Sequence, residues 1–541
     1  MYGSNLDSRE KAREYLRVAH LYRLGDLPTE RPHDATRQLS CWAMADLPRA
    51  VETLKVVDLR ALSMLQSHAA RIDGLREKVV ETLQRGKRVF LCGCGATGRL
   101  SLSLEYLWRE RHPNSEQVFA FMAGGDVALV HSLEGFEDYP EYGARHLEQM
   151  GFSDGDLLIS ATEGGETPYV IGATEQAARI SSNRPFFLYC NRDSALTPHV
   201  ERFRRVRDNP RIENVCLYVG PMALAGSTRM QASTVLQLAV GLALLGAGRD
   251  AANWIERYRE LVRETDFSFL QAFVEREAEI YLDGDHVSYR VQDFGITVLT
   301  DTTERAPTFS LVPFDQLEPG GEDHSLCYVA LDRTGTAAEA WRALLNRAPR
   351  ALDWPEIDAR TRADYLARFD FSLHALGKRR RQLPQRNHHE LGIAGTQGGA
   401  LGFRLQEHRH DVSLHLEETG TRELFRHLLL KQLLNIHSTL VMGRLGRYKG
   451  NLMTWVTPTN GKLVDRAARY VGHLLTAAGE KRVRYDAIVR QLFVEMDAAR
   501  PGEPVVLRTF RALARCNGRA ANPLPLRAPS VGGLRRPGDR V

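Results

Sequence analysis

The chain has 541 residues, of which 43% are apolar and 26% charged, and its formal net charge is +5. This length predicts two to four domains of roughly 100–200 residues each. The composition excludes a fibrous or wholly disordered chain, and seven scattered cysteines exclude a disulfide framework and favour a reducing compartment. With a charged start in place of a signal peptide and no long apolar stretch, we predict a cytoplasmic protein without a membrane partner.

The positive charge is concentrated at one end. From Arg508 onward there are eight arginines and one acid, Asp539, so this segment carries +7 and the rest of the chain about −2. The last stretch is rich in Pro, Gly and Arg, which predicts a disordered tail. A second basic run, 377–386, is predicted to be a solvated helix end or loop. Nucleic acid is therefore not an expected partner.

The first half predicts an open α/β domain. Residues 1–85 read as a helical N-terminal region, and 46–86 carry apolar residues at helical spacing. Strands and helices then alternate, which predicts a parallel sheet with helices on both faces. The expected strands are 88–93, 117–125, 155–162, 185–191 and 214–220, and the expected helices are 99–110, 141–150, 167–180 and 230–247.

The second half repeats this pattern less clearly. After a helical bridge at 250–280, strands are expected within 286–302, 324–332 and 411–418, and helices at 336–348, 421–446, 461–477 and 485–498. The fold class is therefore α/β, with two tandem doubly wound parallel-sheet lobes and helical regions at both ends. The expected domains are 1–85, a first lobe at 86–250, a second lobe at 251–480, and a C-terminal helical region with the basic tail at 481–541.

The loop after the first strand, Gly93-Cys94-Gly95-Ala96-Thr97-Gly98, is typical of phosphate binding at a helix N-terminus. It matches G-x-G-x-x-G, but the acid that a dinucleotide needs is about eight residues late, at Asp126. Two later loops also place a hydroxyl at a helix start, at 165–167 and 226–228. Three such loops favour a compact sugar phosphate over a dinucleotide. The chain lacks G-x-x-x-x-G-K-[ST], which argues against a nucleotide-dependent enzyme.

Several segments resemble a known family. They are TERPHDATRQLS, GCGATGRLS, AGGDVALVHSLEGFEDYPEYGARHL, GGETPYVIGA, VGPMALAGSTRMQAST and, in the second half, GRYKGNLMTWVTPTNGKLVDRA. They resemble the sugar isomerase (SIS) domain family, and within it the N-acetylmuramic acid 6-phosphate etherases and the glucokinase regulatory proteins. The tandem length and the segment GGEDHSL are similar to the regulatory proteins, since an etherase chain is about half as long.

The resemblance implies a sugar-phosphate site at the junction of the lobes. It assigns sugar hydroxyls or acid/base chemistry to Glu134 and Glu137, and it brings His324 and Lys462 over from the second half, with His324 a tentative catalytic residue. The remaining residues that it implies in ligand binding are Gly95, Ala96, Thr97, Gly98, Thr167, Ser227, Thr228 and Arg229. No metal and no cofactor are expected.

Two departures from the etherase pattern matter. Leu107 stands where the etherases carry an acid/base glutamate, and Glu105 lies about 200° away around the expected helix. Glu166 lies in a loop that would meet the phosphate dianion, which a carboxylate repels. Because proton transfer at C2 and at the leaving oxygen needs two poised groups, Leu107 predicts that N-acetylmuramic acid 6-phosphate is not cleaved efficiently.

Two functions remain open. The first is a sugar-phosphate-sensing regulator that acts on a protein partner such as a sugar kinase. The alternative is a lyase, etherase or isomerase acting on an amino-sugar 6-phosphate, with Glu134, Glu137 and His324 as its acid/base groups.

Overall fold

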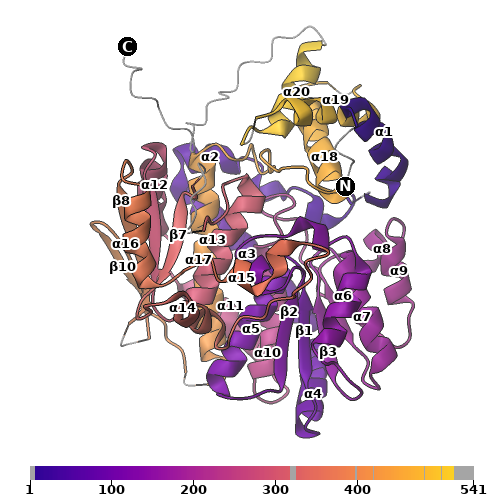
Figure 1. Ribbon diagram of the computed structural model, residues 1–541, viewed down its shortest axis with the longest axis vertical. Helices are drawn as coiled ribbons and strands as arrows, with labels where there is room; N and C mark the ends of the chain where they lie inside the picture. Colours follow the sequence, from indigo (N-terminus) through magenta and orange to yellow (C-terminus); the bar gives the residue numbers. More distant parts are fainter. Residues whose placement is uncertain are drawn as a thin grey trace.

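The computed structural model describes residues 6–22, 24–316, 324–396, 399–417, 419–480, 482–500 and 502–516 (Figure 1). An N-terminal arm precedes the first lobe. Its α-helices are α1 (Ser8–Val18), α2 (Leu39–Ala45), α3 (Leu47–Leu65) and α4 (Ala69–Gln84), and its short 3₁₀ turns are η1 (Ala19–Tyr22), η2 (Pro28–Glu30), η3 (Asp34–Thr36) and η4 (Gln66–His68).

The first lobe contains a five-stranded, all-parallel sheet in the order β2-β1-β3-β4-β5. Its strands are β1 (Val89–Gly93), β2 (Val118–Met122), β3 (Leu157–Ala161), β4 (Phe186–Tyr189) and β5 (Glu213–Cys216). Every residue of β1 and β3 is buried, as expected for central parallel strands covered on both faces. The five strands predicted from the sequence are confirmed.

Helices cover both faces of this sheet. They are α5 (Ala96–Arg111), α6 (Pro140–Gln149), α7 (Pro168–Ile180), α8 (Asp193–Leu196), α9 (Glu201–Arg207) and α10 (Gln231–Leu245), with the turns η5 (Asp126–Leu129) and η6 (Glu134–Phe136). All residues of α10 are buried, because this helix lies between the first sheet and the second lobe. Most of its residues are apolar, which suits such an interior position.

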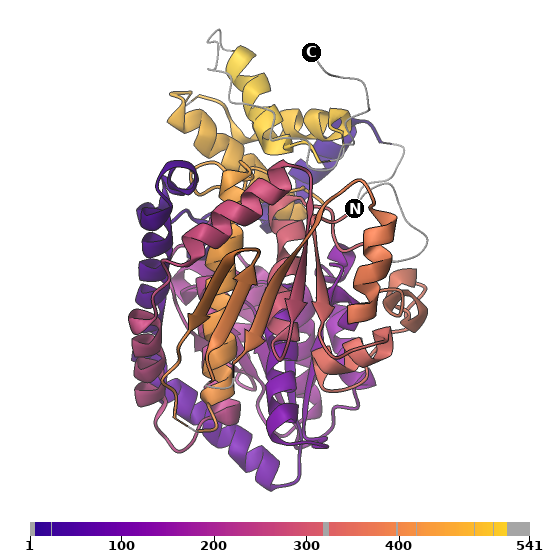
Figure 2. The ribbon, with the colours of Figure 1, turned by 90° about the vertical axis from the view of Figure 1, so that its left-hand side faces the viewer.

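The second lobe holds another five-stranded sheet, in the order β10-β9-β8-β6-β7 (Figure 2). Its strands are β6 (His286–Val291), β7 (Cys327–Leu331), β8 (His388–Gly395), β9 (Leu401–Leu405) and β10 (His408–Val412). The α/β fold class is confirmed, but the prediction of a second wholly parallel sheet is wrong. β9 and β10 run antiparallel, because two residues join them and a parallel pair needs a long crossover.

Other details of the second lobe also differ from the prediction. Residues 413–417 are not a strand, so the strand expected at 411–418 ends at Val412. The basic run 377–386 overlaps α16 (Leu373–Gln382), and Arg379 is buried there. Its guanidinium pairs with Asp315 and lies 3.1 Å from the ring centroid of Tyr328, so the run is not simply solvated.

The other helices of the second half surround its sheet and close the chain. They are α11 (Ala251–Glu264), α12 (Leu270–Leu282), α13 (Gly295–Phe309), α14 (Ala337–Leu345), α15 (Ala363–Leu366), α17 (Arg422–Arg444), α18 (Gly461–Ala477), α19 (Tyr485–Ala498) and α20 (Val505–Cys516), with the turn η7 (Ala359–Thr361). In the part of the chain that the structure describes, none of the helices is long and apolar enough to cross a bilayer. The predicted disordered tail lies outside the described residues.

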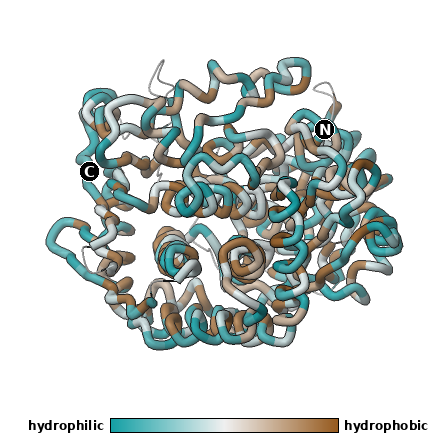
Figure 3. The backbone as a smooth tube through the Cα atoms, turned by 90° about the horizontal axis from the view of Figure 1, so that it is seen from below, coloured by the Kyte–Doolittle hydropathy of each residue, from teal (hydrophilic) through white to brown (hydrophobic). Residues whose placement is uncertain are grey.

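The two lobes pack through helices. α5 and α10 of the first lobe contact α13 and α17 of the second. Buried apolar residues of both lobes belong to one hydrophobic core, and Figure 3 shows the hydropathy of the residues along the chain. At one end, α1 of the N-terminal arm lies beside α19, and α18 lies beside α19 and α20 (Figure 1). The two ends of the chain therefore form a single helical cap.

Candidate functional site

The loop between β1 and α5 has the form predicted for an anion site. Gly95 adopts φ +54°, and a side chain on Gly93 would lie 2.3 Å from the backbone of Thr97, so both positions need glycine. The hydroxyl of Thr97 donates to Cys94 O at 2.9 Å and accepts from Cys94 N at 3.0 Å. Thr97 therefore shapes the loop, and the first turn of α5 faces the carboxyl edge of the sheet.

Ser227 presents an unpaired hydroxyl at the same edge. It is 4% exposed, and its Oγ has no hydrogen-bond partner among the described residues. It follows Gly226, which has φ +74° and lies against Arg466 and Tyr470 of α18. A buried hydroxyl without a partner carries a desolvation cost, which a ligand oxygen would remove. Thr228 is half-buried beside it.

Lys462 crosses from α18 to the first lobe. Its Nζ lies 3.1 Å from Glu137 Oε1 and 2.8 Å from Glu166 Oε1. Glu166 also pairs with Arg202 of α9 at 2.5 Å. Burial opposes the charge on Glu166, but Lys462 and Arg202 outweigh it and hold the pKa of this carboxyl well below its ordinary value. Glu166 is therefore an ionised group with two cations.

Two other carboxyl groups near Lys462 have raised rather than lowered pKa values. Glu163 follows β3, accepts from Ser233 Oγ at 2.9 Å, and has its pKa raised to about 7 by burial and by Glu304. Burial and the charges of Glu137 and Glu166 raise the pKa of Asp138 to about 6. The edge thus holds ionised and protonatable carboxyls side by side, the usual condition for acid/base work.

The N-terminal arm reaches this cluster. Glu30 pairs with Arg466 of α18 at 2.7 Å, and a side chain on Gly461 would lie 2.4 Å from the ring of Tyr22. The arm and α18 therefore lie over the carboxyl edge together. Thr167, which directly precedes α7, shares a 3.0 Å hydrogen bond with Thr162, so its hydroxyl belongs to the loop after β3.

Arg229 joins the lobes. Its Nη1 lies 2.8 Å from Asp301 Oδ1 of α13, and its guanidinium also donates to Ser438 and Thr439 of α17. Both Nη atoms are engaged within the junction, so the phosphate role expected for Arg229 gains no support from this geometry. Arg99 also joins the two lobes, because it forms an ion pair with Glu304 of α13.

Glu105 does not replace the missing glutamate. It is buried, and its carboxylate accepts from Arg109, from Arg347 and Arg350 of the second lobe, and from Ala120 N. Leu107 is 2% exposed and belongs to the hydrophobic core. The acid/base position of the etherases is therefore filled by apolar packing here.

The other predicted residues have varied positions. His324 lies 3.2 Å from Asp315, which Arg379 also binds, and no described contact joins it to the first-lobe edge. η6 begins at Glu134, but the side chain of Glu134 lies outside the described residues. Ala96 and Gly98 lie in the first turn of α5, where Gly98 packs on Met122 of β2.

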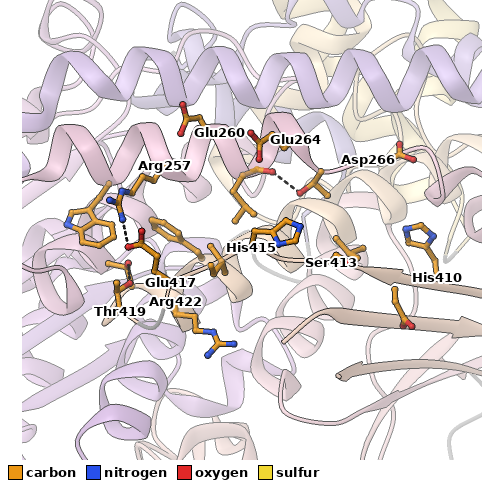
Figure 4. Close-up of a pocket in the computed structure, with 18 residues that line it drawn as sticks. Arg257, Glu260, Glu264, Asp266, His410, Ser413, His415, Glu417, Thr419 and Arg422 are labelled. Atoms are coloured by element: carbon orange, nitrogen blue, oxygen red, sulfur yellow. Dashed lines mark hydrogen bonds and ion pairs between the residues drawn. The ribbon is translucent and has the colours of Figure 1, made fainter. Parts of the chain in front are cut away.

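The structure has a separate hollow of about 580 Å³ on the second lobe (Figure 4). α11, β10 and the start of α17 line it, and Arg257 pairs with Glu417 across it at 2.7 Å. None of the sugar-phosphate loops contributes to its walls. It is therefore distinct from the edge described above.

Sequence reasoning missed Glu163, Asp138 and Arg202 as members of this cluster. Asp138 lies in the segment AGGDVALVHSLEGFEDYPEYGARHL, and Glu163 directly precedes the segment GGETPYVIGA, so their positions next to the family motifs were an available signal. Arg202 comes from α9 and has no such signal, because only the fold brings it to Glu166.

Comparisons with known proteins bear on the first lobe. Residues 72–178 match the family model of the glucokinase regulatory protein N-terminal SIS domain. The match spans the end of α4, the loop after β1 and the loop after β3. The resemblance to SIS domains that the motifs indicated is therefore confirmed for this segment.

Several proteins similar to this chain are named N-acetylmuramic acid 6-phosphate etherase. The protein from Bacillus licheniformis is 28% identical over 223 residues, 40% of this chain and 67% of the relative. The protein from Actinobacillus pleuropneumoniae is 33% identical over 36% of this chain and 61% of its own. That from Enterococcus faecalis is 24% identical over 54% of this chain and 97% of its own.

Among solved structures, the match to tagatose-6-phosphate ketose/aldose isomerase from Escherichia coli covers 76% of this chain and 95% of the isomerase chain. Its TM-score is 0.39 and its sequence identity 9%.

Proposed function

We propose that the carboxyl edge of the first sheet binds an amino-sugar 6-phosphate and acts on it as a lyase or isomerase. The observation that carries this proposal is the set of carboxyls around Lys462. Glu166 stays ionised, whereas Glu163 and Asp138 have raised pKa values. A site that only binds a sugar does not need carboxyls in different protonation states, but proton transfer does.

The phosphate would lie at the first turn of α5 and accept from Ser227 Oγ. The helix N-terminus supplies positive potential there, and Ser227 supplies a hydroxyl without another partner. The negative charge of Glu166 is offset by Lys462 and Arg202. These two cations reduce the repulsion between Glu166 and a bound phosphate. Lys462 also stays bonded to Glu137, and both side chains would then be within reach of the sugar hydroxyls.

The etherase names of the relatives suggest the reaction. Elimination removes the C2 proton, breaks the C3–O bond and protonates the departing lactate oxygen. Water then adds to the unsaturated sugar, so the products are lactate and N-acetylglucosamine 6-phosphate. Leu107 alone predicts that this reaction is slow. Glu163, protonated in part near neutral pH, offers a second group in a different place, and we assign it the proton donation.

A regulator is the second candidate, and one observation favours it. Leu107 is packed in the core at the position of the etherase glutamate, and the second lobe supplies Arg347 and Arg350 to Glu105 nearby. A site adapted to sensing has no need of that glutamate. In this case the lobes would close on an intact ligand and present a surface to a sugar kinase.

One experiment separates the two candidates. The full chain is mixed with N-acetylmuramic acid 6-phosphate, and proton and phosphorus NMR spectra are followed over time. The proposal expects lactate and N-acetylglucosamine 6-phosphate to appear at rates in the ordinary range of roughly 1–10³ per second. A ligand that binds and stays intact would contradict the lyase and support the regulator.

A further inference from the structure

A second cluster of ligand-type side chains lies at the carboxyl edge of the other sheet. Glu110 of α5 meets Glu423 and His427 of α17, and one ligand atom from each lies within 4.8 Å of the others. The loop after β6, with Asp293, lies close enough to act on the charge of Glu110. Nothing in the sugar-phosphate proposal uses these residues.

The helix geometry explains why the cluster forms. Glu423 and His427 are four residues apart on α17, so their side chains lie on one face, one turn apart. Glu110 comes from the last turn of α5, which reaches the second lobe at the junction. Three side chains from two helices therefore converge on one point.

His427 is buried and oriented by a hydrogen bond. It is 1% exposed, and its Nδ1 lies 2.7 Å from Thr297 Oγ1. None of the described residues hydrogen-bonds the other ring nitrogen. When Nδ1 carries the ring proton and donates it to Thr297, Nε2 keeps a lone pair for the cluster. A hydrogen bond to the second nitrogen is how ligating histidines are oriented in proteins.

Glu110 and Glu423 bring two carboxyl groups to the cluster, and Arg426 pairs with one of them, Glu423. Arg426 Nη1 lies 2.9 Å from both oxygens of Glu423. Each carboxylate oxygen has a further lone pair, so this ion pair leaves Glu423 able to bind a cation.

We propose that Glu110, Glu423 and His427 bind a divalent first-row transition cation, with Zn²⁺ the best fit. Imidazole nitrogen and carboxylate oxygen are both ligands that Zn²⁺ accepts, and three protein ligands leave a fourth position for water. The site ties α5 of the SIS lobe to α17, so the cation would stabilise the junction between the lobes.

The test uses the full chain, freed of metal by chelation, and Zn²⁺ alone as the probe. Equilibrium dialysis measures the number of ions bound and their affinity. The proposal expects one ion per chain that both Glu110→Gln and His427→Gln lose, while Glu52→Gln, an exposed acid on α3, keeps it. Glu110 is exposed, so its variant should fold even if the His427 variant does not.

Thr297 gives a finer test of the geometry. Thr297→Val removes the hydrogen bond to Nδ1 and should weaken Zn²⁺ affinity on the order of 10–100-fold, whereas Thr297→Ser should restore it. Absence of Zn²⁺ binding by the unmodified chain would overturn the proposal. So would binding that Glu110→Gln leaves unchanged, since the ion would then lie elsewhere, for example on a cysteine.

Discussion

The carboxyl edges of the two sheets differ in chemistry although the lobes share a fold class. After β1 the left-handed backbone position is Gly95, and after β6 it is Asp293. Glycine lets a phosphate approach the backbone at a helix N-terminus, whereas aspartate fills that space and adds negative charge. Related α/β frames can thus present one edge suited to an anion and one suited to a cation.

The side chains around the two edges differ in charge as well. The first edge has Ser227, Lys462 and Arg202, and the second has Glu110 and Glu423. The second sheet also ends in the β9–β10 hairpin, whose antiparallel strands are joined without a crossover helix. The comparison predicts that sugar-phosphate variants and metal variants act independently, because the two sites lie at the edges of different sheets.

The largest expected effect is on turnover at the first edge. Glu163→Gln keeps the size of the side chain and removes its proton exchange, so kcat should fall by about 10²–10⁴-fold with ligand affinity changed only a few-fold. Lactate release and calorimetry measure the two quantities. Glu201→Gln, on the exposed start of α9, is the matched control. Unchanged turnover in Glu163→Gln would remove this residue from the chemistry.

A substitution at Glu105 should lower the stability of the fold without changing the affinity for the ligand. Glu105→Gln removes one buried charge from three arginines, and breaking such a network costs about 3–5 kcal/mol. Thermal unfolding should show a clear loss of stability, whereas the affinity of the surviving folded protein for a sugar phosphate should stay near that of the unmodified chain. A selective loss of affinity would place Glu105 in the ligand site instead.

A smaller effect is expected at Ser227. Ser227→Val removes a hydrogen bond to a charged ligand and should cost about 1.5–3 kcal/mol, or roughly 10–100-fold in affinity. Titration calorimetry with a sugar phosphate measures this, and Ser67→Val, at an exposed serine in η4, serves as the control. Equal affinities in the two variants would exclude Ser227 from the phosphate site.

A further prediction is a pH dependence of stability. The pKa of Glu163 rises from its ordinary 4.5 to about 7 on folding, so the folded state holds a proton that the unfolded state has lost between these pH values. Its contribution to stability is complete below pH 4.5 and is lost as the pH rises to about 7, by at most about 1.4 kcal/mol per pH unit.

Melting temperatures of the unmodified chain and of Glu163→Gln across this pH range measure that contribution. The variant should show a flatter profile, since glutamine does not titrate. Parallel profiles would mean that Glu163 is not protonated on folding.

Much of the first lobe could be predicted from the sequence, because its elements are signalled locally. Apolar runs such as Val89–Leu91 end in glycine loops, and most residues of α10 are apolar. The second lobe was harder to predict. The hairpin strand β10 is rich in charged and histidine residues. α13 carries buried charges whose partners come from other elements, since Glu304 pairs with Arg99 of the first lobe and Arg305 with Glu277 of α12.

Some features of the candidate site could likewise be predicted from the sequence, and others could not. Lys462 and Glu137 could be brought together from the family motifs, and the structure does join them at 3.1 Å. The roles of Arg229 and Glu105 could not be foreseen, since their partners Asp301 and Arg347 come from distant parts of the chain. A pKa such as that of Glu163 depends on burial and neighbours, which the sequence does not specify.

The number of sugar phosphates bound per chain tests the central claim most directly. We propose that only the first edge binds such a ligand, so titration calorimetry of the full chain with N-acetylglucosamine 6-phosphate should give one site, which Ser227→Val weakens and Glu110→Gln leaves unchanged. Two sites per chain, or one site that Glu110→Gln abolishes, would contradict the account.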